Sequence, residues 1–321
     1  MRVLVTGGSS LLGGSVATAL AARGDDVTVM QRRPSGLPLR EVLADVTDRA
    51  AVSRAVARHD AVVHLAARVG VVGSAAQFRE ANVEGTRQVV GAARAAGASR
   101  FVQVSSPSVA HGGDPLVGVG AGTADPDAAR GDYARTKAEA ELLALAADSP
   151  GFAVVAVRPH LVWGPGDTQL VGRIVDRARS GRLAVIDQGA ALIDTTYLNN
   201  AVDALVAALD VAESVHGEAF VVSNGEPRTV LEMVSRICLA AGAPLPTRHV
   251  PFAVAAAGGG AVERVWARLG RDDDPPMTRF LAEQLATAHW FDQRRTREAL
   301  RWSPRVGLDE GFARLAASLR G

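Results

Sequence analysis

The hydrophobic positions in the first half of this chain alternate between short β-branched runs and longer stretches with helical spacing. Residues 2–6 form the first run, and a glycine-rich turn leads from it into a helical stretch that ends near Arg23. Further strands are predicted at 26–31, 60–66, 100–105 and 152–158, and helices at 47–58, 76–97 and 132–148. Since right-handed crossovers between such strands give a parallel sheet with helices on both faces, we expect an α/β protein with a doubly wound parallel sheet of the Rossmann type.

The regular alternation ends near Pro159, where Gly-Pro and Pro-Pro pairs begin to interrupt the pattern. Helices are predicted near 169–180, 199–213, 229–241, 252–269 and 293–300. We therefore expect a sheet domain over residues 1–160 and a smaller, mainly helical, substrate-binding lobe over 161–321, with one strand at 218–223 returning to the main sheet. The apolar stripe of 252–269 is either core or the border of an apolar tunnel for long alkyl chains.

Composition and charge restrict the kind of partner. The 35 basic and 34 acidic residues nearly cancel, so no global field attracts nucleic acid or an anionic membrane. The single cysteine, Cys238, excludes an intramolecular disulfide and fits a reducing cytoplasm. The sequence shows neither a signal-peptide pattern nor an uninterrupted apolar run of roughly 18 residues. We expect a cytoplasmic protein without a membrane span.

The first turn has the spacing of a dinucleotide-binding loop. Gly7 and Gly13 take the outer positions of Gly-x-x-Gly-x-x-Gly, where a missing Cβ lets the backbone approach a pyrophosphate and the helix N-terminus offers unpaired N–H groups. Ser10 replaces the middle glycine, so either the loop lies further out or the hydroxyl contacts phosphate. A tight strand-to-helix turn without a ligand has the same pattern.

The end of the second strand indicates which dinucleotide is bound. An acidic residue there would bind the ribose 2′-hydroxyl of NAD, but this chain has Gln31, Arg32 and Arg33. A guanidinium binds a 2′-phosphate in a charge-assisted, bidentate way. We therefore predict NADP rather than NAD, with Arg32 as the first candidate, unless both arginines are solvated loop residues. Asp45, which is predicted to end the third strand, either accepts from the adenine amino group or is an exposed loop carboxylate.

Tyr133 and Lys137 place a phenol and an ammonium on one face of a predicted helix. A nearby cation favours the phenolate, so the hydroxyl becomes able to exchange a proton with a substrate oxygen near neutral pH. Such a pair also occurs on solvated helix faces. The upstream strand that ends in Ser105 and Ser106, together with the glycine-rich turn, favours the catalytic interpretation.

Six motifs then follow in the order found in the extended short-chain dehydrogenase/reductases, which the chain resembles over nearly its whole length. They are Thr6-Gly7-Gly8 with Gly13, residues 60–67 (DAVVHLAA), residues 82–86 (NVEGT), Val104-Ser105-Ser106, Tyr133 with Lys137, and residues 158–167 (RPHLVWGPGD). Within that superfamily the chain resembles the 3β-hydroxysteroid dehydrogenase branch. Residues 106–109, 223–227, 278–281 and 289–291 resemble the 2-alkyl-3-oxoalkanoate reductases of bacterial olefin biosynthesis.

The resemblance implies the catalytic roles. Ser106 holds the reacting oxygen, with Ser105 as the rival; Tyr133 transfers the proton; and Lys137 lowers the pKa of the tyrosine and binds the nicotinamide ribose. Hydride addition to a ketone builds negative charge on oxygen, which hydroxyl groups already in place stabilise. Asn82 matches a position that ties helix to strand, and we leave it outside the catalytic set.

The complete predicted cofactor site combines the turn, the strand ends and the catalytic helix. It consists of Gly7, Ser9, Ser10, Leu11, Leu12, Gly13, Arg32, Asp45, Val46, Ala66, Ala67, Ser105, Tyr133, Lys137, Pro159, His160 and Val162. The substrate candidates are Ser106, Ser108, His160, Trp163 and Arg279. His160 either contacts the nicotinamide or substrate or simply packs, and Arg279 either pairs with the carboxylate of a 3-oxoacid or is a surface charge.

The resulting hypothesis is an NADPH-dependent ketoreductase that converts a 2-alkyl-3-oxoalkanoate to the 2-alkyl-3-hydroxyalkanoate. The seven histidines show no metal-ligand spacing, and we expect no metal. The alternatives are a 3β-hydroxysteroid dehydrogenase, a nucleotide-sugar epimerase or dehydratase, for which the second half shows no dense basic cluster, and a non-catalytic NADP-binding regulator. The resemblance also implies a homodimer through helices 76–97 and 132–148, and thiolase-like, β-lactone-forming and decarboxylating partner enzymes.

Overall fold

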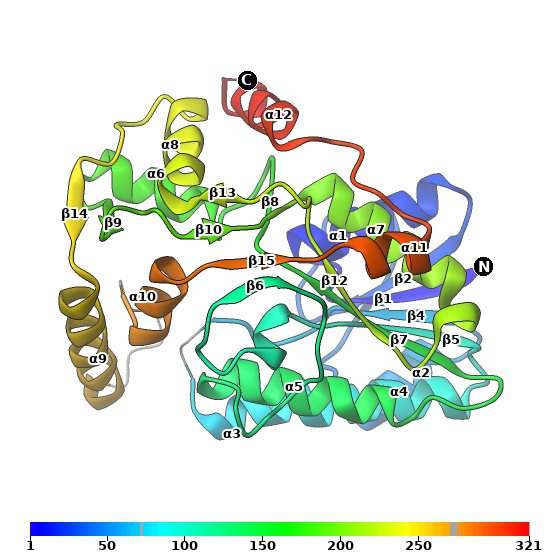
Figure 1. Cartoon of the computed structure of the whole chain (residues 1–321). Coiled ribbons are helices and arrows are strands. Elements are labelled where there is room, and N and C mark those ends of the chain that lie inside the picture. The colour runs from blue at the N-terminus through cyan, green and yellow to red at the C-terminus, as the bar shows by residue number, and fades with distance from the viewer. Residues whose placement is uncertain (71–72, 270–274, 276, 321) are drawn as a thin grey trace.

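A seven-stranded parallel sheet forms the centre of the molecule in a computed structural model that describes residues 1–70, 73–269, 275 and 277–320. The strand order is β12-β7-β5-β4-β1-β2-β3, and every pairing is parallel (Figure 1). The strands are β1 (Arg2–Thr6), β2 (Asp26–Gln31), β3 (Arg40–Leu43), β4 (Ala61–His64), β5 (Arg100–Val104), β7 (Ala153–Pro159) and β12 (Ala219–Val222). The predicted doubly wound fold is confirmed, and so is the late return of one strand to the main sheet.

Helices cover both faces of this sheet because successive strand side chains point to opposite sides. Val3 and Val5 belong to the core beneath α1 (Leu11–Ala22), α7 (Leu198–Val215) and α11 (Arg294–Leu300), whereas Leu4 belongs to the opposite core. That second core lies beneath α2 (Arg49–Val56), α4 (Gly85–Ala95) and α5 (Gly131–Leu145). Figure 1 shows the two helical layers above and below the strands.

The predicted helix at 76–97 is divided into three pieces. It starts with α3 (Ala75–Phe78), continues as a π-helical segment, η1 (Arg79–Glu84), and ends with α4. Ser74 caps the start through a capping box with Gln77. Single π-helical turns inside helices are frequent at functional sites, and this one contains Asn82, whose contacts are described below.

The second half of the chain builds its own core and several short strands. Helices α6 (Val171–Arg179), α8 (Val230–Ala240) and α12 (Leu308–Arg320) pack together there, and Cys238 is fully buried among them. The remaining helices are η2 (Pro107–Ala110), α9 (Phe252–Leu269) and α10 (Arg279–Ala286). The remaining strands are β6 (Leu116–Val119), β8 (Val162–Trp163), β9 (Ala184–Ile186), β10 (Leu192–Ile193), β11 (Thr196–Tyr197), β13 (Arg228–Thr229), β14 (Arg248–Val250) and β15 (His289–Phe291).

The sequence pattern predicted α6, α7, α8, α9 and α11 but missed other elements of the second half. Helix α10, helix α12 and the short sheets were not predicted, because two- or three-residue strands carry too little periodicity to be recognised. Within the described residues no helix has the length and apolar character needed to cross a membrane.

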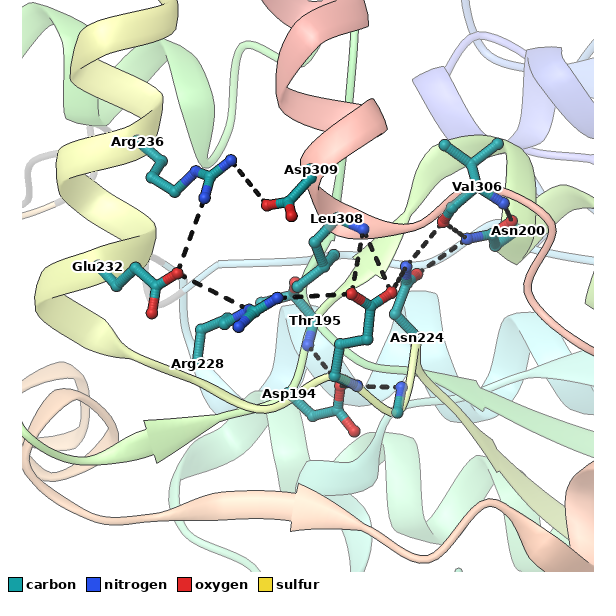
Figure 2. A network of polar contacts seen from close by, with 12 residues as sticks. Asp194, Thr195, Asn200, Asn224, Arg228, Glu232, Arg236, Val306, Leu308 and Asp309 are labelled. Carbon is teal, nitrogen blue, oxygen red and sulfur yellow. Dashed lines mark hydrogen bonds and ion pairs between the residues drawn. The ribbon is translucent and has the colours of Figure 1, made fainter.

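A polar network holds the segment before α12 against the rest of the second half (Figure 2). The backbone carbonyl of Val306 accepts hydrogen bonds from the side-chain amides of Asn200 (2.7 Å) and Asn224 (2.9 Å). The side-chain oxygen of Asn200 in turn accepts from the backbone N–H of Val306 at 3.0 Å. Arg236 of α8 pairs with Asp309 at 2.7 Å. The network therefore fixes α12 to both α7 and α8.

Candidate active site

The carboxyl ends of the parallel strands bring the predicted site residues to one edge of the sheet. Gly7 follows β1, Ala66 follows β4, Ser105 and Ser106 follow β5, and His160 follows β7. The order of the strands places β1, β4, β5 and β7 side by side. Open α/β sheets bind their ligands at this edge, so residues that are far apart in the sequence meet in a single crevice.

The glycine-rich turn fits a dinucleotide because two of its positions admit no side chain. Gly7 has a positive φ of 79°, and a Cβ there would lie 2.9 Å from the backbone nitrogen of Ala66. A Cβ on Gly13 would lie 2.3 Å from the carbonyl oxygen of Gly7. The start of α1 is thus held close to β1 and β4, with its N-terminal N–H groups at the crevice, as pyrophosphate binding requires.

Ser10 replaces the usual middle glycine, and its hydroxyl forms two hydrogen bonds within the loop. Its hydroxyl caps α1 by accepting from the backbone N–H of Gly13 at 3.0 Å, and it donates to the carbonyl of Gly7 at 2.8 Å. Leu11 and Leu12 form the first turn of α1, directly after this cap. The serine therefore stabilises the shape of the loop.

Arg32 and Asp45 lie together at the outer end of the crevice. The Arg32 side chain is 75% exposed, and its guanidinium is 3.9 Å from a carboxylate oxygen of Asp45. The other carboxylate oxygen of Asp45 accepts from the backbone N–H and the hydroxyl of Thr47. The guanidinium therefore remains accessible from solvent, while Asp45 is held in a local turn.

Glu41 is a carboxylate in this region that the sequence reasoning missed. It accepts hydrogen bonds from the backbone N–H and the hydroxyl of Ser35, at 2.8 and 2.7 Å, and from the side-chain amide of Gln31. The Ser35 bonds are the main reason why the pKa of Glu41 lies below its usual value. Glu41 thereby orders the loop that carries Arg32 and Arg33.

Ser106 is positioned by the turn that follows β5. It caps η2, and its hydroxyl oxygen accepts from the backbone N–H of Ser108 at 3.3 Å and from the Ser108 hydroxyl at 3.0 Å. Because these two bonds use the lone pairs of the Ser106 oxygen, its own O–H is left to donate. Ser105 is buried, and its hydroxyl has no hydrogen-bond partner within the described residues.

Tyr133 lies on the first turn of α5 and faces Ser106. Burial raises the pKa of its phenol, and the hydrogen bond with Ser106 lowers it by a smaller amount. The net shift is upward, whereas the spacing of Tyr133 and Lys137 predicted a downward shift. The expectation was wrong because it considered the neighbouring cation and ignored the cost of burying a phenolate.

Lys137 is buried one turn further along α5, and it is the only lysine in the sequence. Its ammonium donates to the backbone carbonyl of Val104 at 2.6 Å. Burial lowers the pKa of this ammonium to about 8, and the carboxylate of Glu141 opposes the shift. Glu141 also forms a buried ion pair with Arg158 of β7. Helix α5 is therefore linked to β5 through Lys137 and to β7 through Glu141.

Asn82 and His64 are buried residues whose side chains hydrogen-bond to neighbouring segments. The Asn82 side chain accepts from the backbone N–H of Arg68 at 2.7 Å and donates to the hydroxyl of Thr136 at 3.0 Å, so it ties the segment after β4 to α5. His64, not selected from the sequence, lies between the hydroxyls of Thr6 (2.7 Å) and Thr86 (3.1 Å). Burial lowers its pKa to about 3, so it is neutral at physiological pH.

His160 is buried and packs against aromatic rings at the other side of the crevice. Its ring centroid is 5.0 Å from that of Phe291 and 5.6 Å from that of His289, both edge-on. His289 was not predicted as a site residue. It comes from β15, more than a hundred residues further along the chain, and no local pattern signals it.

A cavity of about 670 Å³ lies beside this cluster in the second half of the chain. Its walls are mainly apolar and come from α6, α8, α9 and α10, and Leu161, Thr195 and His289 also line it. Arg173, Arg177 and Arg182 contribute positive charge to its wall, so a basic cluster that the sequence reasoning had excluded is in fact present. The i, i+4 spacing of Arg173 and Arg177 on α6 was the available signal.

Two predicted substrate contacts do not reach this cavity. Trp163 is fully buried, donates to the hydroxyl of Thr195 at 3.0 Å and stacks on Phe312 with a centroid distance of 4.5 Å. Arg279 is 69% exposed and pairs with Glu283 at 3.3 Å. Trp163 is thus a core residue and Arg279 a surface charge, and we leave both out of the proposed substrate site.

The sheet edge, the glycine-rich turn and the Ser106–Tyr133 pair together define a nucleotide-dependent oxidoreductase of the extended short-chain dehydrogenase/reductase type. The chain belongs to the NAD-dependent epimerase/dehydratase family, whose profile matches residues 3–223.

Three comparisons relate the chain to individual proteins. It is 41% identical to the 2-alkyl-3-oxoalkanoate reductase of Stenotrophomonas maltophilia, over 99% of both chains. It is 32% identical to a 3-beta-hydroxysteroid dehydrogenase of Mycolicibacterium neoaurum, over 78% of this chain and 72% of that one. Its fold is similar to the solved structure of MoeE5 in complex with UDP-glucose and NAD, with a TM-score of 0.75 and 27% identity over 100% and 99% of the two chains. These relatives support a ketoreductase role.

Proposed function

We propose that the protein is an NADPH-dependent ketoreductase that reduces a 2-alkyl-3-oxoalkanoate to the 2-alkyl-3-hydroxyalkanoate. The observation that carries this proposal is the hydrogen bond between Ser106 and Tyr133 at the sheet edge, in a chain that also has a largely apolar cavity of about 670 Å³ lined by Leu161 and His289. The full-length similarity to a reductase of that name supports the same substrate class.

The side chains of the site suit the reductive direction. When bound, NADPH supplies the hydride that adds to the carbonyl carbon. Ser106 redirects its O–H from the phenol oxygen of Tyr133 to the carbonyl oxygen, and the two bonds from Ser108 keep the serine oxygen in place. Tyr133 gives its proton to the same oxygen as negative charge develops there. The raised pKa of Tyr133 keeps the phenol protonated until that moment.

Lys137 supports this proton transfer from one turn along α5. Its pKa of about 8 leaves it mostly protonated at neutral pH, so a positive charge is present on the helix face that carries the phenol. We further propose that the same ammonium binds the nicotinamide ribose hydroxyls. The hydrogen bond to Val104 holds it at the end of β5.

The preference for NADPH over NADH is proposed from the chemistry of the second strand end. The exposed guanidinium of Arg32 is able to bind a 2′-phosphate, and the nearby Glu41 carboxylate is already occupied by Ser35 and Gln31. A carboxylate committed to protein donors competes poorly for the 2′-hydroxyl of NAD.

The alkyl chains of the substrate would lie in the cavity between α6, α8 and α10. Its aliphatic wall includes Ile174, Leu183, Val230, Met233 and Leu281. Burying methylene groups against such a wall is favourable by about 0.8 kcal/mol each, so kcat/KM should rise with chain length until the cavity is filled. On this view the substrate lobe is residues 161–321 without the sheet-associated elements β12, α7 and α11.

A second candidate is an enzyme acting on a nucleotide sugar. The arginines at positions 173, 177 and 182 line the cavity, and guanidinium groups bind diphosphates well. The likeness to MoeE5 with UDP-glucose points the same way. The mainly apolar wall favours the alkyl substrate over this alternative, and an apolar steroid is the remaining competitor.

A substrate panel tests the proposed function. Purified protein is incubated with NADP⁺ and, separately, a 2-alkyl-3-hydroxyalkanoate, a 3β-hydroxysteroid or UDP-glucose, and NADPH formation is followed by absorbance. The UDP-glucose reaction is also analysed for an epimerised or dehydrated product, because those reactions form no net NADPH. We expect turnover of the hydroxy acid, with a kcat/KM at least about a hundredfold above that for the others. Turnover of only the steroid or the nucleotide sugar would replace the proposed substrate, and turnover of none would favour a regulator.

Two assembly proposals accompany this function. We propose a homodimer formed through α4 and α5, the helices that this superfamily commonly uses, and light scattering of the purified protein tests it. We also propose that a thiolase-like enzyme supplies the oxoacid and that β-lactone-forming and decarboxylating enzymes consume the hydroxy acid, as expected of olefin biosynthesis.

A further inference from the structure

Three buried histidines from distant parts of the chain lie together beside the apolar cavity. His111 follows η2, His160 follows β7 and His289 begins β15, and they are 4%, 7% and 3% exposed. The ring centroid of His289 is 5.6 Å from that of His160 and 6.3 Å from that of His111. We refer to these three residues as the histidine cluster.

The cluster has hydrogen-bonding capacity that the protein itself does not use. Within the described part of the chain, Nδ1 of His111 and Nε2 of His160 have no hydrogen-bond partner, and the backbone of Gln284 approaches the His289 ring without reaching ordinary hydrogen-bond geometry. Buried polar atoms in native proteins are nearly always satisfied, so several unsatisfied atoms at one place point to a ligand. Among the described residues no three His, Cys, Asp or Glu side chains are grouped so as to hold a metal ion.

The position of the cluster identifies which part of a substrate it would meet. His289 lines the 670 Å³ cavity beside Leu161 and Thr195. His160 follows β7, which pairs with β5, and the backbone N–H of Ser105 bonds to Val157 of β7 at 2.7 Å. His111 follows η2, which Ser106 caps, and His289 lines the cavity, so the cluster connects the segment after Ser106 with the apolar cavity.

The proposed substrate has a matching arrangement of groups. In a 2-alkyl-3-oxoalkanoate a single carbon separates the ketone from the carboxylate, and that same carbon carries the alkyl branch. A ketone held at Ser106 and Tyr133, with an alkyl chain in the cavity, leaves the carboxylate at the border between them, where the histidine cluster lies. Neutral imidazole N–H groups are suitable donors to a carboxylate.

The charges around the cluster determine its protonation. Burial lowers the pKa of His160 to about 3 and that of His289 to about 4, and neighbouring histidines contribute in the same direction. The backbone of Gln284 opposes the shift at His289. Burial is the main reason why the pKa of His111 lies below its usual value; Arg130 acts in the same direction, while Asp114 and Glu283 oppose it. At neutral pH the empty cluster is uncharged, and an incoming anion would favour protonation.

We propose that His111, His160 and His289 form the binding site for the carboxylate of the substrate, and that the cluster takes up a proton when the acid binds. This inference rests on the proposed function, because it assigns the residues that would bind the carboxylate of that substrate. It gives a reason for recognition: a 3-oxoacid readily loses its carboxylate to become a simple ketone, and the cluster distinguishes the acid from that ketone.

Calorimetry with a non-reacting ligand tests the inference separately from turnover. The probe is 2-hexyldecanoate, which has the branched acid without the 3-oxygen, and 2-hexyldecanol is the uncharged control. Binding to the full-length protein is measured at neutral pH in two buffers with different ionisation enthalpies. We expect the acid to bind with a buffer-dependent enthalpy that corresponds to proton uptake, and the alcohol to bind without it.

The variant His289→Phe keeps a ring at the cavity wall and removes both nitrogens. We expect it to weaken binding of the acid about tenfold or more and to leave binding of the alcohol within a factor of about two. His216→Phe, a half-exposed histidine paired with Asp148, is the matched control and should bind both probes as the wild type does.

The inference fails if the wild type does not bind the acid, binds it without proton uptake, or binds acid and alcohol equally well. Unchanged acid binding in His289→Phe would also overturn it. If that variant does not fold, the wild-type proton count decides alone. Failure of the substrate panel with success here would replace the proposed reaction and keep the carboxylate site.

Discussion

The ammonium of Lys137 donates a hydrogen bond of 2.6 Å to the backbone carbonyl of Val104, the last residue of β5. This bond ties α5 to the strand that delivers Ser105 and Ser106 to the sheet edge. The same lysine therefore connects the helix that carries Tyr133 with the strand that leads to Ser106, the two residues proposed to act on the carbonyl oxygen.

The protonation of Lys137 can be observed directly because it is the only lysine in the sequence. In protein labelled with ¹³C-lysine, we expect a single side-chain resonance that titrates near pH 8, since burial lowers its pKa from 10.5 to about 8. In urea the same resonance should titrate near 10.5, the ordinary pKa of a lysine in an unfolded chain. A folded-state pKa close to 10.5 would contradict the buried position.

The direction of the Lys137 shift predicts how activity depends on pH. As pH rises through about 8 the ammonium loses its proton, and its support for the phenolate is lost. The kcat for ketone reduction should therefore fall above this pH. In the variant Lys137→Met the rate should be lower by about 100-fold or more and the step near pH 8 should disappear; a step that persists in the variant belongs to another group.

Alanine variants of Ser106 and Ser105 show which of the two hydroxyl groups acts on the substrate oxygen. Ser106→Ala removes the group that contacts Tyr133, so kcat should fall by about 100-fold or more. Ser105→Ala removes a buried hydroxyl without a described partner, and kcat should stay within about threefold. If the two results are reversed, the residues have been assigned in the wrong order.

Arg32 and Arg33 form a matched pair for the coenzyme. Arg32→Ala should raise the KM for NADPH about tenfold or more and leave the KM for NADH unchanged, because only the 2′-phosphate is affected. Arg33→Ala is the control on the same exposed loop. An unchanged preference for NADPH in Arg32→Ala would exclude the proposed role.

The buried histidines predict that stability decreases between pH 7 and pH 5. Burial lowers the pKa of His64 and His160 to about 3 and that of His289 to about 4, while the unfolded chain binds these protons near 6.5. Below 6.5 the unfolded state therefore holds more protons, and each histidine reduces the free energy of unfolding by about 1.4 kcal/mol per pH unit.

Urea unfolding at pH 7 and pH 5 measures this effect. Carboxyl groups whose pKa is lowered in the folded protein titrate below pH 5. Between pH 7 and pH 5 the change in the free energy of unfolding therefore comes mainly from the histidines. His289→Phe should reduce the pH dependence and His216→Phe should not. Equal free energies of unfolding at the two pH values would show that the three histidines are not buried in their neutral forms.

The sequence predicted the parts of the site that depend on local pattern. Gly7, Ser106, Tyr133 and Lys137 lie in short motifs at strand ends or on one helix face, and the parallel sheet brings them to one edge. His111 and His289 were not predicted because they are brought together only when β15 pairs with β6, a contact between segments more than 170 residues apart.

The direction of the Tyr133 pKa shift could not be predicted from the sequence either. Spacing on a helix shows that a cation is near, but the shift depends on how much solvent the fold removes from the phenol. Trp163 illustrates the same limit: it stands within a family motif, yet its indole is enclosed by Tyr197 and Phe312 in the core of the second half.

Proton donation by Tyr133 is the central step of the proposed mechanism, and the variant Tyr133→Phe tests this step most directly. Hydride transfer to a 2-alkyl-3-oxoalkanoate is measured in single-turnover reactions with NADPH, with Tyr197→Phe, which alters the only other tyrosine, as the control. We predict that Tyr133→Phe lowers the rate by about 100-fold or more and that Tyr197→Phe leaves it within about threefold. A Tyr133→Phe protein that reduces the substrate at the wild-type rate would contradict the account.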